Sequence, residues 1–510
     1  MATLSLASIL AESALRRPGH TAVIEGERRL SYAELWLQAR GQAAALAALG
    51  VRPGDRVALM APNTVEFPRA YYAILAAGAV VVPIHLLMGP EETAHVLRDS
   101  GAKLLLCHAA VLAGGAQAAI AARVRLMAIG PPASAPGVDG RLEDLAETTP
   151  PPSTHVSRAP DDPAVVFYTS GTTGVPKGAV LTHLNLVMNA TVNAFDCHDV
   201  RRCDVALGAL PLFHTYGQSV SMNATFRLGA TMVLLPRFQA AEAIALMIKE
   251  GVTIFHGVPT MFHALSAAAE DASELPRLRL CISGGASLPG PVLERFEKSF
   301  GTEVYEGYGL SETSPTATVN QPVFGRRVGT VGHPVWGVDV EIARADLEEE
   351  IELLAAGELG EIVIRGHNVF AGYLDLAEAT ASSLVDGWFR TGDLGTRDAD
   401  GFVAVVDRKK DMVIRGGFNV YPREVEDVLL RHPEIAEVAV IGLPHPVHGE
   451  EICAVVVPAG EEREAETLVE WARDRLGPLR YPRRVEFVDE LPLGPSLKVL
   501  KRELRARYSG

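Results

Sequence analysis

Short apolar runs of strand length alternate with segments of helical periodicity through the middle of the chain. In chain order they are apolar runs at 205–210 and 231–235, a helical stretch at 239–250, an apolar run at 252–256, a helix near 260–270, a strand at 278–282, a helix at 289–300 and a strand at 303–305. Strands that alternate with helices are typical of a parallel sheet covered by helices. The pattern therefore predicts an α/β core.

The most apolar stretch lies earlier, over residues 71–88. It is interrupted by Gly78, Pro83 and His85, so it is better explained by a buried helix that ends at Gly78 and a strand at 79–82 than by a membrane span. The N-terminus has no basic residue ahead of its apolar part and does not predict a secretory signal.

Beyond residue 355 the pattern changes to short strands separated by Gly and Asp, for example 360–366 and 401–407, which predict an antiparallel subdomain. A charged segment follows at 408–411. The remainder predicts a compact mixed unit with a helix at 422–431, strands at 438–441 and 452–457, and a helix at 464–476. We expect an N-terminal domain of residues 1–407, with parallel α/β subdomains and an antiparallel β subdomain, and a small α+β C-terminal domain of residues 408–510.

Length and composition agree with this organisation. The 510 residues exceed the size of a single core, and 48% hydrophobic with 21% charged residues is ordinary for a folded enzyme. A formal net charge of −15 disfavours nucleic acid and anionic membranes as general partners. The five scattered cysteines form no C-x-x-C pair, which favours a reducing cytoplasm over a disulfide framework or a zinc site.

The segment 168–178, Tyr-Thr-Ser-Gly-Thr-Thr-Gly-Val-Pro-Lys-Gly, directly follows an apolar run. Its glycines allow close approach to an anion, its hydroxyls donate hydrogen bonds, and Lys177 supplies a compact positive charge. This composition predicts a phosphate-binding loop. Five residues rather than four separate Gly171 from Lys177, and no Ser or Thr follows the lysine, so the loop is not of the Walker type.

Two further motif segments, both expected to be loops, follow predicted neighbouring strands, at 283–286 (Ser-Gly-Gly-Ala) and 306–313 (Glu-Gly-Tyr-Gly-Leu-Ser-Glu-Thr). In open parallel sheets, ligands bind beyond the carboxyl ends of the strands. We therefore expect both segments to lie at one crevice.

Together with Trp-Phe-Arg-Thr-Gly-Asp at 388–393, Asp-Arg-Lys-Lys-Asp at 407–411 and a lysine near the C-terminus, these motifs resemble the acyl-adenylate-forming superfamily over nearly the whole chain. That superfamily includes acyl-CoA synthetases, luciferases and peptide-synthetase adenylation domains. The segment Arg-Gly-Gly-Phe-Asn-Val-Tyr-Pro at 415–422 is most similar to fatty-acid and related carboxylate CoA ligases.

The resemblance implies ATP, Mg2+ and CoA, and a reaction in two steps. A carboxylic acid reacts at the α-phosphorus of ATP to give acyl-AMP and pyrophosphate, and a thiol then displaces AMP. A medium- or long-chain fatty acid is the expected substrate. The alternative acceptor is the phosphopantetheine of an acyl carrier protein, and a third possibility is a nucleotide-binding protein that has lost catalysis.

The resemblance also implies the nucleotide site. The loop at 169–177 would hold the β- and γ-phosphates, Gly284 to Ala286 and Tyr308 the adenine, Ser311 the α-phosphate region, Asp393 with Arg408 the ribose, and Glu312 the Mg2+. The complete predicted ATP-binding set is Thr169, Ser170, Gly171, Thr172, Thr173, Gly174, Lys177, Gly284, Gly285, Ala286, Glu306, Gly307, Tyr308, Gly309, Ser311, Asp393 and Arg408.

For the acyl group the resemblance implies a pocket in which His214 lies beside the reacting carboxylate. The predicted lining residues are His214, Tyr216, Gly217, Val258 and Gly285. No charged side chain occurs from Thr215 to Ala224, which favours a neutral and mostly apolar acyl group.

In the family the small domain rotates between the two steps. The hinge corresponds to Lys410, or to Lys409 if the register differs by one, and Lys498 would be the catalytic lysine of the first step. Gly416, Gly417 and Phe418 would line the thiol tunnel in the second step. One departure is notable, because Leu497 stands where the family has glycine, and a glycine-only backbone conformation there would strain it by roughly 1 to 3 kcal/mol.

Overall fold

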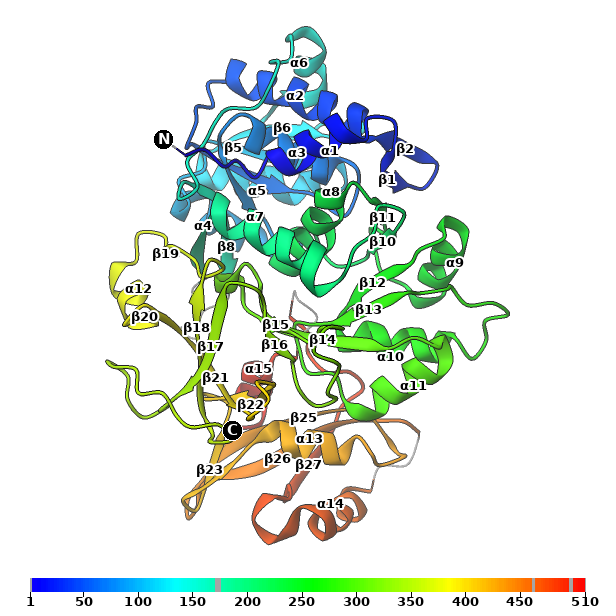
Figure 1. The fold of residues 1–510 in the computed structure, drawn as a ribbon. Helices are drawn as coiled ribbons and strands as arrows, with labels where there is room; N and C mark the ends of the chain where they lie inside the picture. The colour runs from blue at the N-terminus through cyan, green and yellow to red at the C-terminus, as the bar shows by residue number, and fades with distance from the viewer. Residues whose placement is uncertain (1, 170–175, 461–463, 495–498, 510) are drawn as a thin grey trace.

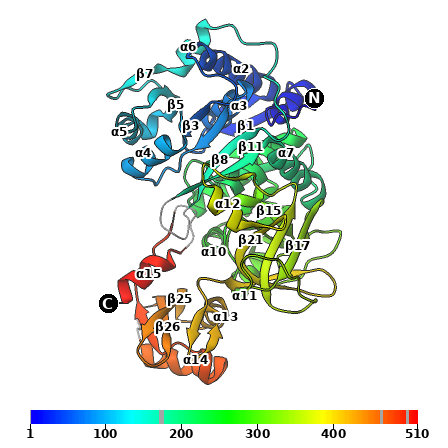
Figure 2. The same ribbon diagram turned by 90° about the vertical axis from the view of Figure 1, so that its left-hand side faces the viewer.

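A computed structural model describes residues 2–169, 176–460, 464–494 and 499–509. In Figure 1, one large sheet with its helices forms the top of the molecule, the other large sheet lies in the middle at the right, an antiparallel sheet lies at the left, and a small α+β unit forms the lower end. Figure 2 shows this C-terminal unit set apart from the two large sheets. The predicted fold class is confirmed.

The first large sheet has eight strands, and six of them are parallel. Their order is β19 (Gly372–Tyr373), β9 (Lys177–Thr182), β8 (Pro163–Thr169), β4 (Val80–Pro83), β3 (Arg56–Met60), β5 (Leu104–His108), β6 (Arg125–Ile129) and β7 (Val138–Arg141). The first two strands in this order are antiparallel, β9 to β8 and β19 to β9. The predicted phosphate loop therefore joins two antiparallel neighbours, whereas a Walker loop leads from a strand into a helix.

The second large sheet has nine strands and contains the predicted parallel α/β core. Their order is β16 (His333–Pro334), β15 (Thr316–Val319), β14 (Val304–Gly309), β13 (Leu280–Ser283), β12 (Ile254–Gly257), β10 (Val205–Gly208), β11 (Thr231–Leu234), β1 (Thr21–Glu25) and β2 (Arg28–Ser31). β14 is longer than the predicted strand at 303–305 because its second half pairs with β15, as Tyr308 does with Thr318. The segment Glu306 to Gly309 is thus part of a strand and not a loop.

Helices cover these two sheets. They are α1 (Ser8–Arg16), α2 (Tyr32–Ala48), α3 (Glu66–Ala76), α4 (Pro90–Asp99), α5 (Leu112–Ala122), α6 (Leu142–Thr148), α7 (His183–Val192), α8 (Ala224–Leu228), α9 (Ala240–Glu250), α10 (Pro259–Ala268) and α11 (Gly290–Phe300). All residues of α3 are buried, as expected for the apolar stretch that ends at Gly78. Two π-helical segments also occur, η2 (Asn193–Cys197) and η3 (Tyr216–Asn223), and η4 (Ser311–Thr313) is a 3-10 turn.

Local sequence explains several helix ends. Thr182 accepts a hydrogen bond from the Asn185 backbone while the Asn185 side chain accepts one from the Thr182 backbone, so this pair fixes the start of α7 directly after β9. Gly251 and Gly301 follow α9 and α11 with φ of 64° and 65°, a conformation that favours glycine.

The antiparallel sheet consists of β17 (Val338–Ala343), β18 (Gly360–Gly366), β21 (Trp388–Arg397), β20 (Leu384–Val385) and β22 (Val403–Arg408), with α12 (Ala377–Ser383) beside it. The C-terminal unit contains β24 (Phe418–Val420), β23 (Val413–Arg415), β26 (Gly449–Pro458), β25 (Ile435–His445) and β27 (Arg484–Phe487), with α13 (Pro422–Leu429), α14 (Ala465–Arg480) and α15 (Lys501–Tyr508). β22 ends at Arg408, so the predicted boundary after residue 407 lies where the chain passes between these sheets.

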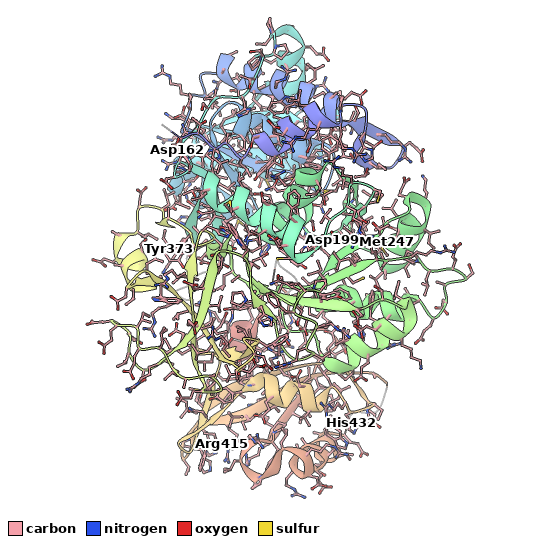
Figure 3. The ribbon with its side chains drawn as sticks, viewed as in Figure 1. Asp162, Asp199, Met247, Tyr373, Arg415 and His432 are labelled. Carbon is pink, nitrogen blue, oxygen red and sulfur yellow. The ribbon has the colours of Figure 1, made fainter. Side chains whose placement is uncertain are left out.

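Side chains fill the space between the elements (Figure 3), and one core joins the two large sheets through residues such as Val23 of β1, Leu59 of β3 and Leu234 of β11. The C-terminal unit has a core of its own, built from Val413, Val425, Val440 and Val456 among others. No helix among the described residues is long and apolar enough to cross a membrane.

Candidate active site

Neighbouring strands bring the predicted adenine-binding residues together. β13 runs parallel to β14 with Ser283 beside Glu306, so the segment after Ser283 lies close to the strand that carries Tyr308. A side chain at Gly284 would be 3.1 Å from the Tyr216 ring, which explains the need for glycine there. Gly285 has a φ of 82°. The backbone of Gly284 and Gly285 therefore forms one wall of the predicted adenine site, beside the strand that carries Tyr308.

Tyr308 is connected to the predicted ribose-binding pair. Its hydroxyl donates a 2.7 Å hydrogen bond to Oδ2 of Asp393, and Nε of Arg408 lies 3.4 Å from Oδ1 of the same carboxylate. Asp393 and Arg408 are direct partners between β21 and β22. Burial, followed by the charge of Asp393, raises the pKa of Tyr308 well above its usual range, so the phenol stays a donor.

The predicted ATP-binding residue Glu306 is buried on β14. Its Oε1 accepts a 3.3 Å hydrogen bond from the Leu288 backbone, and burial raises the pKa of its carboxyl group to about 6. In this structure Glu306 therefore holds the segment after Ala286 in place beside the adenine wall.

Lys177 and Glu312 are linked through Tyr373, a residue that sequence reasoning did not identify. The Lys177 ammonium lies 5.3 Å from the centroid of the Tyr373 ring, and the Tyr373 hydroxyl donates a 2.9 Å hydrogen bond to Oε1 of Glu312. Tyr373 reaches this position because β19 adds to the edge of β9, the strand that begins with Lys177. One aromatic side chain thus contacts both the predicted phosphate lysine and the predicted metal ligand.

Glu312 fits the role of an Mg2+ ligand. It is a buried carboxylate with one oxygen fixed by Tyr373. Mg2+ commonly takes one or two protein carboxylates and completes its shell with waters and substrate phosphates. The described part of the chain contains no cluster of three or more His, Cys, Asp or Glu that could hold a metal ion by itself.

We expect Tyr373→Phe to weaken the use of Mg2+ while leaving the ring under Lys177 intact. The lost hydrogen bond to the carboxylate is charge-assisted and worth about 1.5 to 3 kcal/mol, so the Mg2+ concentration for half-maximal pyrophosphate release should rise about tenfold. Tyr373→Leu, which also removes the ring, should raise the KM for ATP further. Equal Mg2+ dependence in wild type and Tyr373→Phe would contradict this role.

The remaining residues of the phosphate loop are only partly described. Thr169 and Lys177 face each other as the last β8–β9 pair. Ser170, Gly171, Thr172, Thr173 and Gly174 lie outside the described residues, so their predicted contacts stay predictions.

Thr215 connects the acyl and phosphate parts of the site. Its buried hydroxyl donates a 3.0 Å hydrogen bond to Oγ of Ser311, the predicted α-phosphate residue. The adjacent His214 accepts a 3.3 Å hydrogen bond at Nδ1 from the Tyr216 backbone, which assigns the proton of the neutral ring to Nε2. His214 is therefore adjacent in sequence to Thr215, whose hydrogen bond to Ser311 connects the predicted acyl pocket with the predicted nucleotide site.

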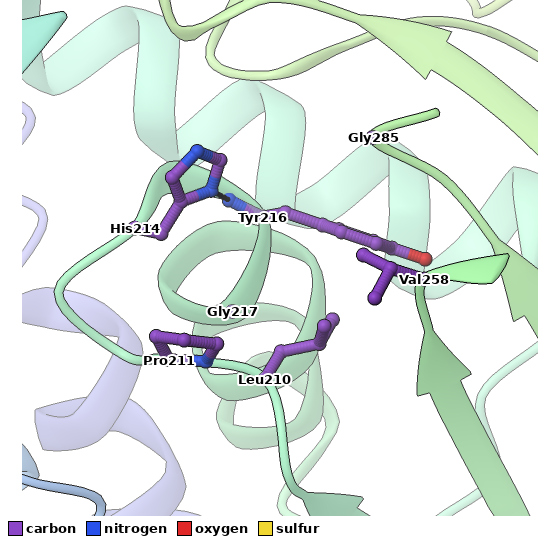
Figure 4. A pocket seen from close by; sticks show the side chains of 7 residues that line it. All are labelled: Leu210, Pro211, His214, Tyr216, Gly217, Val258 and Gly285. Atoms are coloured by element: carbon purple, nitrogen blue, oxygen red, sulfur yellow. Dashed lines mark hydrogen bonds between the residues drawn. The ribbon is translucent and has the colours of Figure 1, made fainter. Parts of the chain in front are cut away.

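The five predicted acyl-pocket residues line one pocket, together with Leu210 and Pro211 (Figure 4). His214 lies at one side of this pocket and Val258 at the other, with the Tyr216 ring between them. The Tyr216 hydroxyl donates a 3.0 Å hydrogen bond to the Ile282 carbonyl. A side chain at Gly217 would lie 2.3 Å from the Pro211 carbonyl oxygen, so η3 packs directly on that backbone.

Two buried histidines stand behind Tyr216 and were not predicted. The His256 ring centroid is 6.4 Å from that of Tyr216 and 5.5 Å from that of His198. Among the described residues, no group pairs with any of their four ring nitrogens. Burial lowers the pKa of His256 to about 3, and burial followed by His256 lowers the pKa of His198 well below its usual range. Both are therefore neutral in the folded protein.

We expect this pair to make the protein sensitive to acid. The pKa of His256 in the folded state, about 3, lies below the unfolded value of about 6.5, so the unfolded chain takes up the proton as the pH falls. The free energy of unfolding should drop by roughly 1 kcal/mol per such histidine between pH 7 and pH 5.5. Denaturant titrations at both pH values should show a smaller drop in His256→Leu than in wild type. An equal drop in both proteins would contradict the assignment.

The predicted hinge and tunnel residues lie in or next to the C-terminal unit. Lys410 is in a turn where the Lys409 backbone donates to Gly392 and the neighbouring Asp411 pairs with Arg505 at 3.0 Å. Gly416 and Gly417, with φ of 57° and 84°, connect β23 to β24, and the side chain of Phe418 is exposed. Gly416 donates its backbone hydrogen bond to His448 of the same unit. Leu497 and Lys498 lie outside the described residues.

Comparison with known proteins shows the family of the chain. The family model described as AMP-binding enzyme matches residues 10–374, and the model described as AMP-binding enzyme C-terminal domain matches residues 424–498. The chain belongs to the AMP-binding enzyme family. It is an AMP-forming acyl-CoA synthetase that activates a carboxylic acid with ATP and transfers the acyl group to CoA.

Relatives with different acids resemble the chain over almost its full length. A feruloyl-CoA synthase of Amycolatopsis sp is 40% identical and covers 96% of both chains, and a long-chain-fatty-acid–CoA ligase of Bacillus subtilis (strain 168) is 35% identical over 98% of this chain and 94% of its own. The crystal structure of ATP-bound MatB from Rhodopseudomonas palustris superposes with a TM-score of 0.89, at 33% identity and 99% coverage of both chains.

Proposed function

We propose that the enzyme activates a carboxylic acid with an uncharged and mainly apolar acyl group, in the first instance a medium- or long-chain fatty acid. The lining of the acyl pocket supports this proposal. Leu210, Pro211, Tyr216 and Val258 contribute apolar surface, and none of the lining side chains that the structure describes is Asp, Glu, Lys or Arg. A second carboxylate on the acyl group would lose its hydration in such a pocket without gaining a charge partner.

A second candidate substrate is an aromatic acid with a polar ring substituent. The name of the feruloyl-CoA synthase relative suggests this class. His198 and His256 favour it, because their buried ring nitrogens have no partner among the described residues and lie behind the aromatic wall of the pocket. An alkyl chain has no hydrogen-bonding group for these nitrogens, whereas a phenolic hydroxyl or methoxyl group would pair with them if Tyr216 moved aside.

A screen of acids by pyrophosphate release separates the candidates. It should include saturated fatty acids of increasing length, cinnamic acid, and hydroxylated and methoxylated cinnamic acids. The fatty-acid proposal expects the highest kcat/KM with an alkyl acid. If the substrate is an aromatic acid, kcat/KM should be higher for the ring-substituted acids than for cinnamic acid itself, and His256→Leu should remove that difference. A dicarboxylic acid as the best substrate would contradict both.

The acceptor and the setting are also part of the proposal. CoA is the acceptor shared with the relatives, and a purified acyl carrier protein in place of CoA tests the alternative. All five cysteines are free thiols, which supports the expected reducing cytoplasm. Mg2+ would be held by Glu312 and would neutralise phosphate charge during the first step.

A further inference from the structure

A second pocket contains four arginines and lies away from the predicted active-site residues. Its lining consists of Ser13, Arg16, Arg17, Phe195, Arg202, Arg227 and Leu228. The ends of α1 and α8, two helices that lie side by side in Figure 1, form it together with η2 and the segment before β10. None of these residues belongs to the nucleotide site or to the acyl pocket.

The pocket is separated from Lys177 by a whole helix. β9 begins at Lys177, α7 starts at His183 beyond the end of β9, and η2 with Phe195 follows the last residue of α7. A helix of ten residues is about 15 Å long, so the pocket lies at the end of α7 far from the phosphate hairpin. An anion bound there would not occupy the ATP site.

The charges around the pocket are not balanced within the fold. Glu12, which lies 3.1 Å from Arg16, is the one carboxylate in ion-pair contact with these four arginines among the described residues. Such a concentration of positive charge is unexpected in a chain whose formal net charge is −15. Burial, followed by the charge of Arg16, lowers the pKa of Arg227.

Part of this charge has a structural use. Arg17 donates to the carbonyls of Arg202 (2.7 Å) and Gly229 (2.6 Å), and Nε of Arg227 donates to Thr191 (3.1 Å). The exposed Arg202 differs, because among the described residues no group bonds its guanidinium. These hydrogen bonds explain Arg17 and Arg227, but they leave the presence of Arg16 and Arg202 at the same pocket unexplained.

We propose that this pocket is a second anion site, which binds the phosphate group of an organic phosphate. Planar guanidinium groups bind phosphate oxygens in pairs, and several of them together suit a doubly charged anion better than a monocarboxylate. Phe195, half exposed with Arg227 stacked on its ring at 5.1 Å, and Leu228 add apolar surface for the organic part of the ligand. The phosphate belongs either to a soluble metabolite or to a lipid headgroup.

The test compares Arg16→Gln/Arg202→Gln with Arg201→Gln. Arg201 lies in the same segment but outside the pocket lining, where it is exposed and pairs with Asp199 at 3.1 Å, so it is a matched control. Arg17 and Arg227 are left in place because their hydrogen bonds stabilise the fold. Pyrophosphate release without added phosphate should be the same in all three proteins, which shows that the variants fold and keep their catalytic site.

Binding is measured by equilibrium dialysis with inorganic phosphate and glycerol 3-phosphate, while an ATP analogue fills the active site. Co-sedimentation with phosphatidylcholine vesicles, with and without phosphatidic acid, forms the second arm. We expect wild type and Arg201→Gln to bind glycerol 3-phosphate at least about tenfold more tightly than the double variant. If arginine-dependent binding is seen only with vesicles that contain phosphatidic acid, the ligand is a lipid headgroup. Absence of binding in both arms, or equal binding by the double variant, overturns the proposal.

Discussion

Replacement of Lys498 by Ala should lower the rate of acyl-AMP formation at least about a hundredfold and leave the second half-reaction nearly unchanged. The first step builds negative charge where the carboxylate meets the α-phosphate, and a fixed cation at that place stabilises the transition state more than the ground state. Thiol attack on a preformed adenylate would take place with the small domain in the second orientation that the family resemblance implies, in which this lysine would be remote.

Lys498 lies outside the described residues, and its role is the one implied by the family position. The structure describes its surroundings, in which Leu493 pairs with Val499 and the Leu500 backbone donates to Pro492. α15 is then attached to the hinge and to α13 by the pairs Arg505–Asp411 and Lys501–Glu426, of 3.0 Å and 2.7 Å. The chain next to Lys498 is thus tied to the part of the molecule that would rotate.

The measurement needs both half-reactions. Acid-dependent pyrophosphate exchange reports the first step, and thioester formation from supplied acyl-AMP and CoA reports the second. Arg502→Ala removes a nearby exposed cation and serves as the control, with both rates expected at the wild-type level. Equal loss of both rates in Lys498→Ala would contradict a model in which the domain has two orientations.

The predicted motifs come together because each is placed by a strand. Tyr308 is on β14, Asp393 on β21 and Lys177 on β9, and strand periodicity is readable in a single sequence. One local prediction from this pattern was wrong. Glu306 to Gly309 contain two glycines and were expected as a loop, but antiparallel pairing with β15 keeps them extended.

The contacts between elements that are far apart in the chain could not be predicted from the sequence. Tyr373 contacts Lys177 and Glu312 only because a two-residue strand adds to the edge of β9, and nothing near Tyr373 in the sequence signals that pairing. His198 lies between Cys197 and Cys203 without a complete set of metal ligands, and His256 lies in an ordinary apolar run, so the sequence marks neither residue. Their proximity follows from the packing of the segment after η2, in which Val200 shares a core with Ala206 of β10 and Ile254 of β12. Periodicity does not determine this packing.

Replacement of Gly417 by Leu should have the opposite effect to the loss of Lys498. Gly417 has a φ of 84°, and a side chain built there would meet no atom within 4 Å in this structure. Leucine should therefore cost only the strain of a left-handed backbone, about 1 to 2 kcal/mol, and leave adenylation within about twofold of wild type. If the β23–β24 turn lines the thiol tunnel in the second orientation, the same side chain blocks pantetheine, and thioester formation should fall by about a hundredfold.

Gly477→Leu provides a matched control for this substitution. Gly477 belongs to the same C-terminal unit, has a φ of 73°, and also has no atom within 4 Å of an added side chain. With a ψ of 176°, its backbone would be strained by a side chain at least as much as that of Gly417. It has no predicted place on the tunnel, so both half-reactions should stay at the wild-type level. If Gly417→Leu and Gly477→Leu slow thioester formation equally, the loss comes from strain in the small domain. Normal CoA turnover in Gly417→Leu would refute the tunnel, because a leucine side chain cannot share a narrow channel with pantetheine.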